Sequence, residues 1–181
     1  MNVMKTNIVL IGYMGTGKTA VGRRLAEKLG MKFIEVDSLI EKQAGRKITD
    51  IFHTAGGTAF REMEIEAIKK IAAEKRSVIA CGGGVVLNRI NIDRLQENGV
   101  VVYLTASTHI IMKRVSVEAG KRPLLEIENQ LKTITDMLKF RKPFYERSAD
   151  ITINTSRLSV EAVAENIIQQ LKKNESLNFK K

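Results

Sequence analysis

The sequence predicts an α/β fold: a five-stranded parallel sheet with helices on both of its faces. Two observations support this expectation. Short apolar runs alternate with stretches of helical periodicity from end to end, which is typical of doubly wound sheets. In addition, a glycine-rich stretch, Gly12–Thr19, stands between the first apolar run and the first helical pattern. Open sheets of this class bind their ligands at such a junction.

The five predicted strands are Asn7–Ile11, Lys32–Val36, Ser77–Cys81, Gly99–Leu104 and Asp150–Thr155. The first is apolar throughout, as expected of a strand that is buried on both faces. The helix after it repeats Val21, Leu25 and Leu29 at four-residue spacing and stops at Gly30. Two later helices carry similar apolar stripes, which we interpret as core: Phe60, Met63, Ala67 and Ile71 after a Gly-Gly pair, and Val160, Val163, Ile167 and Leu171 after Ser159.

Length and composition predict a globular protein. The chain has 181 residues, of which 44% are apolar and 28% charged. We expect a single domain over residues 1–174 and a basic tail over 175–181. No run reaches the roughly 20 apolar residues of a membrane span, and the N-terminus lacks the apolar core of a secretory signal. Cys81 is the only cysteine, so no internal disulfide can form and we expect the protein in the reducing cytoplasm. We expect Cys81 to be packed in the core. We also expect a monomer.

The formal net charge of +10 has two interpretations. It suits either a nucleic-acid-binding surface or a protein whose ligands are small anions. The basic residues are spread along the chain, without a block of five like charges and without interleaved aromatic residues. This distribution favours an anionic small-molecule pocket, and we expect no nucleic-acid or membrane partner.

Gly12–Thr19 fits the phosphate-binding pattern G-x-x-x-x-G-K-[ST] without a mismatch. Its glycines allow positive φ angles, so that backbone N–H groups turn inward and form a nest for phosphate oxygens. Lys18 can reach the β- and γ-phosphates, and the Thr19 hydroxyl can ligate Mg²⁺. The alternative is a glycine-rich turn with an incidental Lys-Thr pair.

A polar segment between two helical patterns, 109–115 and 127–147, contains Lys121, Arg122 and Pro123. A mobile connection with two cations suits a lid that closes over a polyphosphate, and we place this lid at about residues 115–125. A plain surface loop is the alternative.

The second predicted strand ends with two carboxylates, Glu35 and Asp37, on one face of the strand. One could accept a hydrogen bond or a proton from an attacking hydroxyl, and the other could hold Mg²⁺ through water. For Asp37, a helix N-cap is the alternative role.

The third strand is followed by Gly82-Gly83-Gly84. Three glycines lose much chain entropy on folding, so close backbone approach to a bound molecule explains them better than a turn does. Arg61 and Arg141 lie beside or on apolar helix stripes, where a guanidinium needs an anion. Together they could bind a carboxylate, although each arginine taken singly is more often part of a structural ion pair than a ligand-binding residue.

The chain resembles the bacterial shikimate kinases over nearly its whole length. The phosphate loop alone is generic, but the ordered set of motifs is specific. It consists of Gly12–Thr19, the acidic pair ending in Asp37, Phe60-Arg61-x-x-Glu64, Gly82-Gly83-Gly84, Arg122-Pro123-Leu124-Leu125 and the run from Arg141 to Ala149.

The resemblance implies the three-layer architecture of P-loop kinases and transfer of the ATP γ-phosphoryl group to the 3-hydroxyl of shikimate, on the route to chorismate and the aromatic amino acids. By the same analogy Asp37 binds ring hydroxyls and is the candidate base, while Arg61, Arg141 and the backbone of Gly82, Gly83 and Gly84 hold the acid. The resemblance assigns nucleotide binding to Gly15, Thr16, Gly17, Lys18, Thr19, Ala20, Arg114 and Arg122. Thr19 would ligate Mg²⁺ and Arg114 would lie beside adenine. Arg122 would contact the phosphates and stabilise charge in the transition state, so that it is a candidate catalytic residue together with Lys18 and Asp37.

One position departs from the family, whose members usually have aspartate where this chain has Glu35. The side chain is one methylene longer, which changes its reach toward Mg²⁺. Two other functions suit parts of the sequence. A kinase for another small hydroxy acid, such as gluconate, would also use both arginines, and a nucleotide-dependent RNA-binding module would use the positive charge.

Overall fold

The computed structural model describes residues 4–119, 124–174 and 179, with side chains for 4–116, 129–174 and 179. The helices are α1 Lys18–Leu29, α2 Val36–Ala44, α3 Ile48–Ile71, α4 Arg89–Asn98, α5 Thr108–Ala119, α6 Leu124–Ser148 and α7 Val160–Lys173. The strands are β1 Asn7–Ile11, β2 Lys32–Glu35, β3 Ser77–Ala80, β4 Gly99–Thr105 and β5 Ile151–Asn154, and a 3₁₀ turn spans Val85–Leu87.

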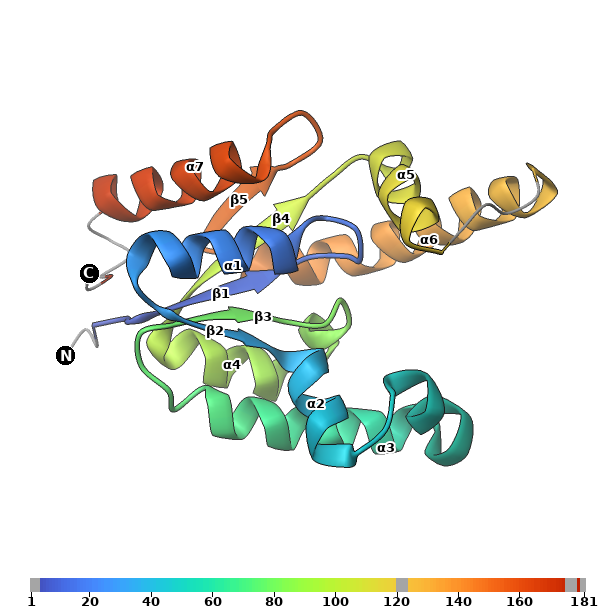
Figure 1. Cartoon of the computed structure of the whole chain (residues 1–181), viewed down its shortest axis with the longest axis horizontal. Coiled ribbons are helices and arrows are strands. Elements are labelled where there is room, and N and C mark those ends of the chain that lie inside the picture. The colour runs from blue at the N-terminus through green and yellow to red at the C-terminus, as the bar shows by residue number, and fades with distance from the viewer. Residues whose placement is uncertain (1–3, 120–123, 175–178, 180–181) are drawn as a thin grey trace.

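The strands form one five-stranded sheet in the order β2-β3-β1-β4-β5, and every pair is parallel. The predicted fold class is therefore confirmed, with strand ends differing by one residue. All strands point the same way in Figure 1, so their carboxyl ends meet at one edge of the sheet. Because β1 lies between β3 and β4, the loop after it opens at the centre of that edge.

Side chains of alternate strand residues build two separate cores, one on each face. On one face Ile8 and Leu10 pack with α1 and α7, and on the other Val9 and Ile11 pack with α2, α3, α4 and Tyr145 of α6. Figure 1 shows α1 and α7 on one side of the sheet and α3 and α4 on the other. The predicted three layers follow from this division.

Most residues of the helical stripes are buried as predicted, although Leu29 and Met63 are only partly buried. Val163, Ile167 and Leu171 of α7 are in the core and Ser159 caps that helix, but Val160 is 41% exposed. In α3, Gly56 has non-helical angles (φ 79°, ψ 174°), which kink the helix and turn its first part toward the carboxyl edge of the sheet (Figure 1). No helix in the described ranges is long and apolar enough to span a membrane.

The two helices that flank the predicted lid are longer than the sequence indicated. Helix α5 continues to Ala119 and α6 begins at Leu124, so residues 115–119 and 124–125 are helical rather than part of a polar loop. Residues 120–123, with Arg122, lie outside the described residues. Helix α6 also runs through Pro143 without interruption, which keeps Arg141 and Tyr145 on one side of it. At the other end of the chain, Phe179 of the predicted tail forms an isolated parallel bridge with Lys5.

Candidate active site

The phosphate loop joins β1 to α1 in the predicted conformation. Gly12, Gly15 and Gly17 have φ angles of 145°, 74° and 96°, which side chains rarely tolerate. At Gly12 a Cβ atom would also lie 2.3 Å from the backbone oxygen of Leu104. Helix α1 begins at Lys18 with Gly17 at its N-cap, so the loop wraps the positive end of a helix. This combination makes an anion site.

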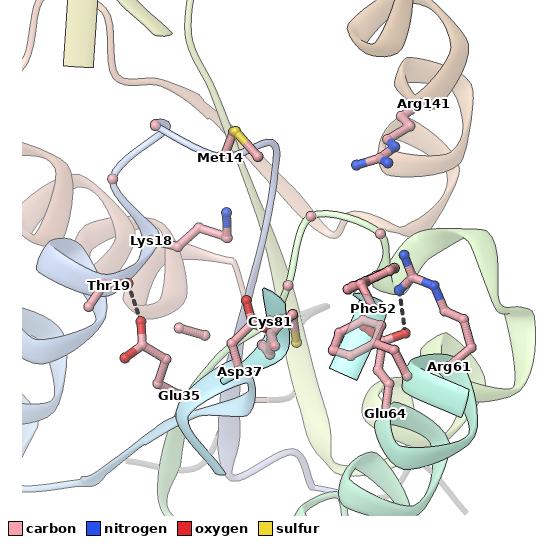
Figure 2. A pocket seen from close by; sticks show the side chains of 18 residues that line it. Met14, Lys18, Thr19, Glu35, Asp37, Phe52, Arg61, Glu64, Cys81 and Arg141 are labelled. Atoms are coloured by element: carbon pink, nitrogen blue, oxygen red, sulfur yellow. Dashed lines mark hydrogen bonds and ion pairs between the residues drawn. The ribbon is translucent and has the colours of Figure 1, made fainter. Parts of the chain in front are cut away.

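Lys18 lies half-buried under the loop. Its Nζ donates hydrogen bonds of 2.9 Å to the backbone oxygens of Gly12 and Tyr13. Burial lowers the pKa of Lys18 to about 8, against the opposing attraction of the Asp37 carboxylate. The amine is therefore a cation near neutral pH, placed between the loop and the acidic side chain that faces it (Figure 2).

Thr19 and Glu35 meet beside the loop, where their oxygen atoms could hold a magnesium ion. The Thr19 hydroxyl donates to Oε1 of Glu35, and the Ser38 hydroxyl donates to Oε2 at 2.9 Å. A hydroxyl beside a carboxylate at a polyphosphate site suits Mg²⁺, which takes one or two protein oxygens and fills its remaining positions with water and phosphate. A larger cluster of three or more His, Cys, Asp or Glu side chains is not found within the described chain.

A cavity of about 410 Å³ opens next to the loop, at the carboxyl edge of the sheet. Figure 2 shows Lys18 on one side of it, Arg61 and Arg141 on the other, and Asp37 between them. Most of the predicted site residues line this cavity, namely Gly15, Gly17, Lys18, Thr19, Asp37, Arg61, Gly82, Gly83, Gly84 and Arg141. The structure thus brings together side chains from five separate segments.

Asp37 is in the first turn of α2, because β2 ends at Glu35. The prediction that both carboxylates share a strand face is therefore wrong, and Asp37 is not the N-cap either. Its Oδ1 atom is buried and has no hydrogen-bond partner among the described residues. Burial raises the pKa of Asp37, and Lys18 opposes that rise. Buried acceptors are normally hydrogen-bonded, so this oxygen is available to accept a hydrogen bond from a ligand hydroxyl in the cavity.

Arg61 and Arg141 converge on the glycine run. A Cβ atom at Gly84 would lie 2.2 Å from Nη2 of Arg61, and one at Gly83 would lie 3.4 Å from Nη1 of Arg141. A side chain at position 84 would therefore displace the Arg61 guanidinium, whereas the distance at Gly83 is an ordinary van der Waals contact. Nε of Arg141 is buried and lacks a hydrogen-bond partner in the described part of the chain. Two cations at one end of a cavity suit a carboxylate ligand.

Tyr145 holds the glycine run from beneath. Its hydroxyl donates a 2.6 Å hydrogen bond to the Gly83 oxygen, and its ring stacks on Tyr103 at a centroid distance of 4.8 Å. Burial raises the pKa of Tyr145 to about 12, so the hydroxyl keeps its proton and remains a donor at neutral pH.

Three predicted nucleotide residues lie outside the cavity. Thr16 is buried and its hydroxyl donates to the Tyr13 oxygen, while Ala20 is exposed on α1. Arg114 is bound to the backbone of the phosphate loop and to Thr155 rather than standing free. Arg122, the fourth, is outside the described residues.

Sequence reasoning assigned no role at the cavity to seven residues that line it: Met14, Ile48, Phe52, Phe60, Glu64, Ala80 and Cys81. Glu64 lies three residues after Arg61, a spacing at which helical side chains meet, and this was the one available signal. Cys81 is 2% exposed, as the core interpretation expects, and burial raises the pKa of its thiol far above neutral. The thiol therefore stays protonated and is a poor nucleophile.

A phosphate loop beside a cavity with one unpaired carboxylate and two guanidinium groups defines a class of protein, the P-loop kinases that phosphorylate a small anionic alcohol. Comparisons with known proteins identify the family. The family model described as shikimate kinase matches residues 14–172. The shikimate kinase of Thermodesulfovibrio yellowstonii is 49% identical over 164 residues, which cover 91% of this chain and 94% of the relative. That of Caldanaerobacter subterraneus is 46% identical over 163 residues, 90% and 94% of the two chains.

Solved structures give the same result. The shikimate kinase from Acinetobacter baumannii in complex with shikimate superposes with a TM-score of 0.86 at 37% identity, covering 94% of this chain and 95% of that one. The enzyme from Aquifex aeolicus has a TM-score of 0.76 at 29% identity, covering 94% and 98%. This chain belongs to the shikimate kinase family and is an ATP-dependent phosphotransferase.

Proposed function

We propose that this enzyme phosphorylates the 3-hydroxyl of shikimate within the cavity beside Gly12–Thr19. The single observation that carries the proposal is the arrangement of three side chains around one space: Asp37 with a bare buried oxygen, and Arg61 and Arg141 at the far end. An acid bound by the two guanidinium groups would place its ring between them and Asp37, with its hydroxyls toward the phosphate loop.

In this proposal Asp37 accepts a hydrogen bond from the attacking hydroxyl. It takes the hydroxyl proton as the new oxygen–phosphorus bond forms and the bond from the γ-phosphorus to the leaving ADP oxygen breaks. The raised pKa of Asp37 brings its basicity closer to neutral pH, which favours this role. Lys18 and the N–H groups of the loop bind the phosphate oxygens, where charge is spread during transfer. Mg²⁺, held by Thr19 with Glu35 nearby, would neutralise part of that charge. The Lys18 amine would become available to phosphate by breaking its hydrogen bonds to the Gly12 and Tyr13 oxygens.

The wall of the cavity favours a ring over an open chain. Phe52, Phe60 and Ile48 of α3 line it opposite the phosphate loop, and apolar side chains suit the carbon face of a cyclic acid. Gluconate, the rival acceptor, is an extended polyol and offers no such face. The geometry thus supports shikimate as the acceptor, in agreement with the family.

An assay of ADP release tests the proposal. With Mg²⁺ and ATP present, we expect turnover to depend on added shikimate and to be at least about a hundred-fold slower with gluconate at equal concentration. Turnover with gluconate but not with shikimate, or ADP release that does not increase when shikimate is added, would contradict the proposed substrate. A ³¹P–¹H correlation NMR spectrum of the product then shows whether the phosphate is on the 3-hydroxyl or on a neighbouring hydroxyl.

We further propose that one chain, folded as a single domain over residues 1–174, is the working unit and that it acts in the cytoplasm. The buried, unpaired thiol of Cys81 suits a reducing compartment. The side chains proposed for binding and chemistry all come from one chain, so the site needs no second copy. Light scattering on the eluting enzyme tests this, with the mass of one chain expected.

A further inference from the structure

Helix α5 packs directly on the phosphate loop. A Cβ atom at Gly15 would lie 3.1 Å from Cγ2 of Val115 and 3.2 Å from the backbone oxygen of Ile111. Ile111 is completely buried and forms a small third core with Tyr13 of the loop and Ile134 of α6. The position of α5 and the shape of the loop are therefore linked.

Arg114, on the next turn of α5, makes the polar part of this contact. Its Nη1 donates to the Gly15 oxygen at 3.1 Å and to Oγ1 of Thr155 at 3.0 Å, and its Nη2 donates to the Thr155 oxygen at 2.9 Å. Hydrogen bonds from a guanidinium are stronger than those between neutral groups. One side chain thus ties the phosphate loop to the segment after β5.

Thr155 binds the next residue of the loop, Thr16. It is 3% exposed, its hydroxyl donates a 3.0 Å hydrogen bond to the Thr16 oxygen, and its own N–H donates to the Thr105 oxygen at 2.8 Å. The residue is therefore anchored to the end of β4. Arg114 and Thr155 together hold two consecutive carbonyl groups of the loop, those of Gly15 and Thr16.

Holding these carbonyls fixes the two peptide units. The N–H of the first unit, that of Thr16, already donates to the Tyr13 oxygen at 3.4 Å, and the second unit carries the Gly17 N–H. In a trans peptide the C=O and the N–H point in opposite directions. With the Thr16 oxygen held by Thr155, the Gly17 N–H faces the other way, at the start of α1 where a phosphate would bind. A donor that is oriented before the ligand arrives avoids the free-energy cost of ordering it during binding.

We propose that Arg114 is a positioning residue that, with Thr155, orients the phosphate loop for any polyphosphate, whether or not it carries a base. The proposal rests on nucleotide binding by the loop, proposed above. It differs from the role that the family resemblance implies, in which Arg114 lies beside adenine. A contact to adenine matters only for ligands that have one, whereas the loop contact acts on the phosphates themselves.

Binding of inorganic tripolyphosphate and of ATP, each with Mg²⁺, separates the two roles. We expect Arg114→Met and Thr155→Val each to weaken both ligands by about ten-fold, since Arg114 holds the Gly15 carbonyl and the Thr155 hydroxyl holds that of Thr16. Arg114→Lys keeps one donor and is expected to recover part of the affinity. In turnover, KM for ATP rises while KM for shikimate stays within two-fold of the wild type, which a general loss of structure would not produce.

Matched variants serve as controls. Thr155→Ser keeps the hydroxyl and is expected to bind like the wild type, as is Lys113→Met, which removes an exposed cation from the same helix. Calorimetric binding of shikimate checks that each variant is folded. A loss for ATP alone in Arg114→Met, or unchanged binding in Thr155→Val, would overturn the proposal. A wild-type enzyme that bound neither ligand would contradict the proposed function itself, and the loop contact with it.

Discussion

Arg61 and Glu64 form an ion pair on α3, with Nη1 of the arginine 2.7 Å from Oε2 of the glutamate. The Glu64 side chain is 1% exposed and its other oxygen, Oε1, has no hydrogen-bond partner in the described residues. Burial raises the pKa of Glu64, and Arg61 opposes the rise. One half of the Arg61 guanidinium is thus held by the protein, while Nη2 is left near Gly84 at the cavity.

The ion pair predicts a specific effect of Glu64→Gln. A neutral amide holds the guanidinium less firmly, so Arg61 must be ordered when the acid binds. We expect KM for shikimate to rise by roughly ten-fold, with kcat within about three-fold of wild type. Glu62→Gln, an exposed neighbour on the same helix, is the control and should change neither parameter. A fall in kcat without a change in KM would show that Glu64 does not act through Arg61.

Gly84→Ala is expected to displace Arg61 while the fold stays intact. The added Cβ would meet the far end of a flexible side chain, Nη2 at 2.2 Å, so the guanidinium moves rather than the backbone. Stability should change by less than about 1 kcal/mol. Shikimate affinity, measured by calorimetry, should fall by at least about ten-fold, and ATP affinity should not change. Equal losses for both ligands would point to a collapsed site instead.

Asp37→Asn should separate activity from stability. We expect kcat to fall by about 10²–10⁴, the usual contribution of a positioned base. The folded-state pKa of Asp37 lies above its unfolded value, so its ionised form reduces stability once the pH rises past that unfolded value. Replacing it with a neutral amide at pH 7 should therefore raise the unfolding free energy by up to about 1 kcal/mol.

Thermal unfolding without ligands measures the second effect, as a rise in Tm of about 2–4 °C. Unchanged turnover would remove Asp37 from the chemistry. A clear loss of thermal stability would mean that the buried carboxylate has a partner that stabilises its charge.

The lowered pKa of Lys18 predicts a pH-dependent affinity for polyphosphate. In the ligand-free enzyme the amine loses its charge as the pH rises through about 8, so affinity should be steady near pH 7 and fall above 8. Tripolyphosphate titrations from pH 7.5 to 9.5 would show the decline, reaching about ten-fold per pH unit. Lys18→Arg stays charged throughout and should give a flat profile at any affinity. A flat wild-type profile would contradict the lowered pKa.

The sequence was sufficient to predict the sheet and the phosphate loop because both depend on local patterns. Apolar runs such as Asn7–Ile11 mark buried strands, and the loop motif fixes its own geometry through glycines. The end of β2 was misjudged because Val36 continues the apolar run, yet its side chain is buried as the first residue of α2. The local sequence does not distinguish a carboxylate at the end of a strand from one in the first turn of the helix that follows.

The rest of the site depends on contacts between distant segments. Arg114 and Thr155 are 41 residues apart, and no local pattern links them to Gly15. The kink at Gly56 brings Phe52 to the cavity. From the sequence, the Gly-Gly pair indicated only that a helix begins after it. Burial of Glu64 comes from packing of α3 on the sheet, which a helical stripe alone does not specify.

The central claim is that Arg61 and Arg141 bind the carboxylate of the acceptor. The most direct measurement compares the affinities of shikimate and its methyl ester for wild type, Arg61→Met and Arg141→Met. We predict that the wild type prefers the acid by at least about a hundred-fold and that each substitution reduces this preference by about ten-fold. A preference that stays the same in both variants would contradict the account, because the charge of the acid would then be bound elsewhere.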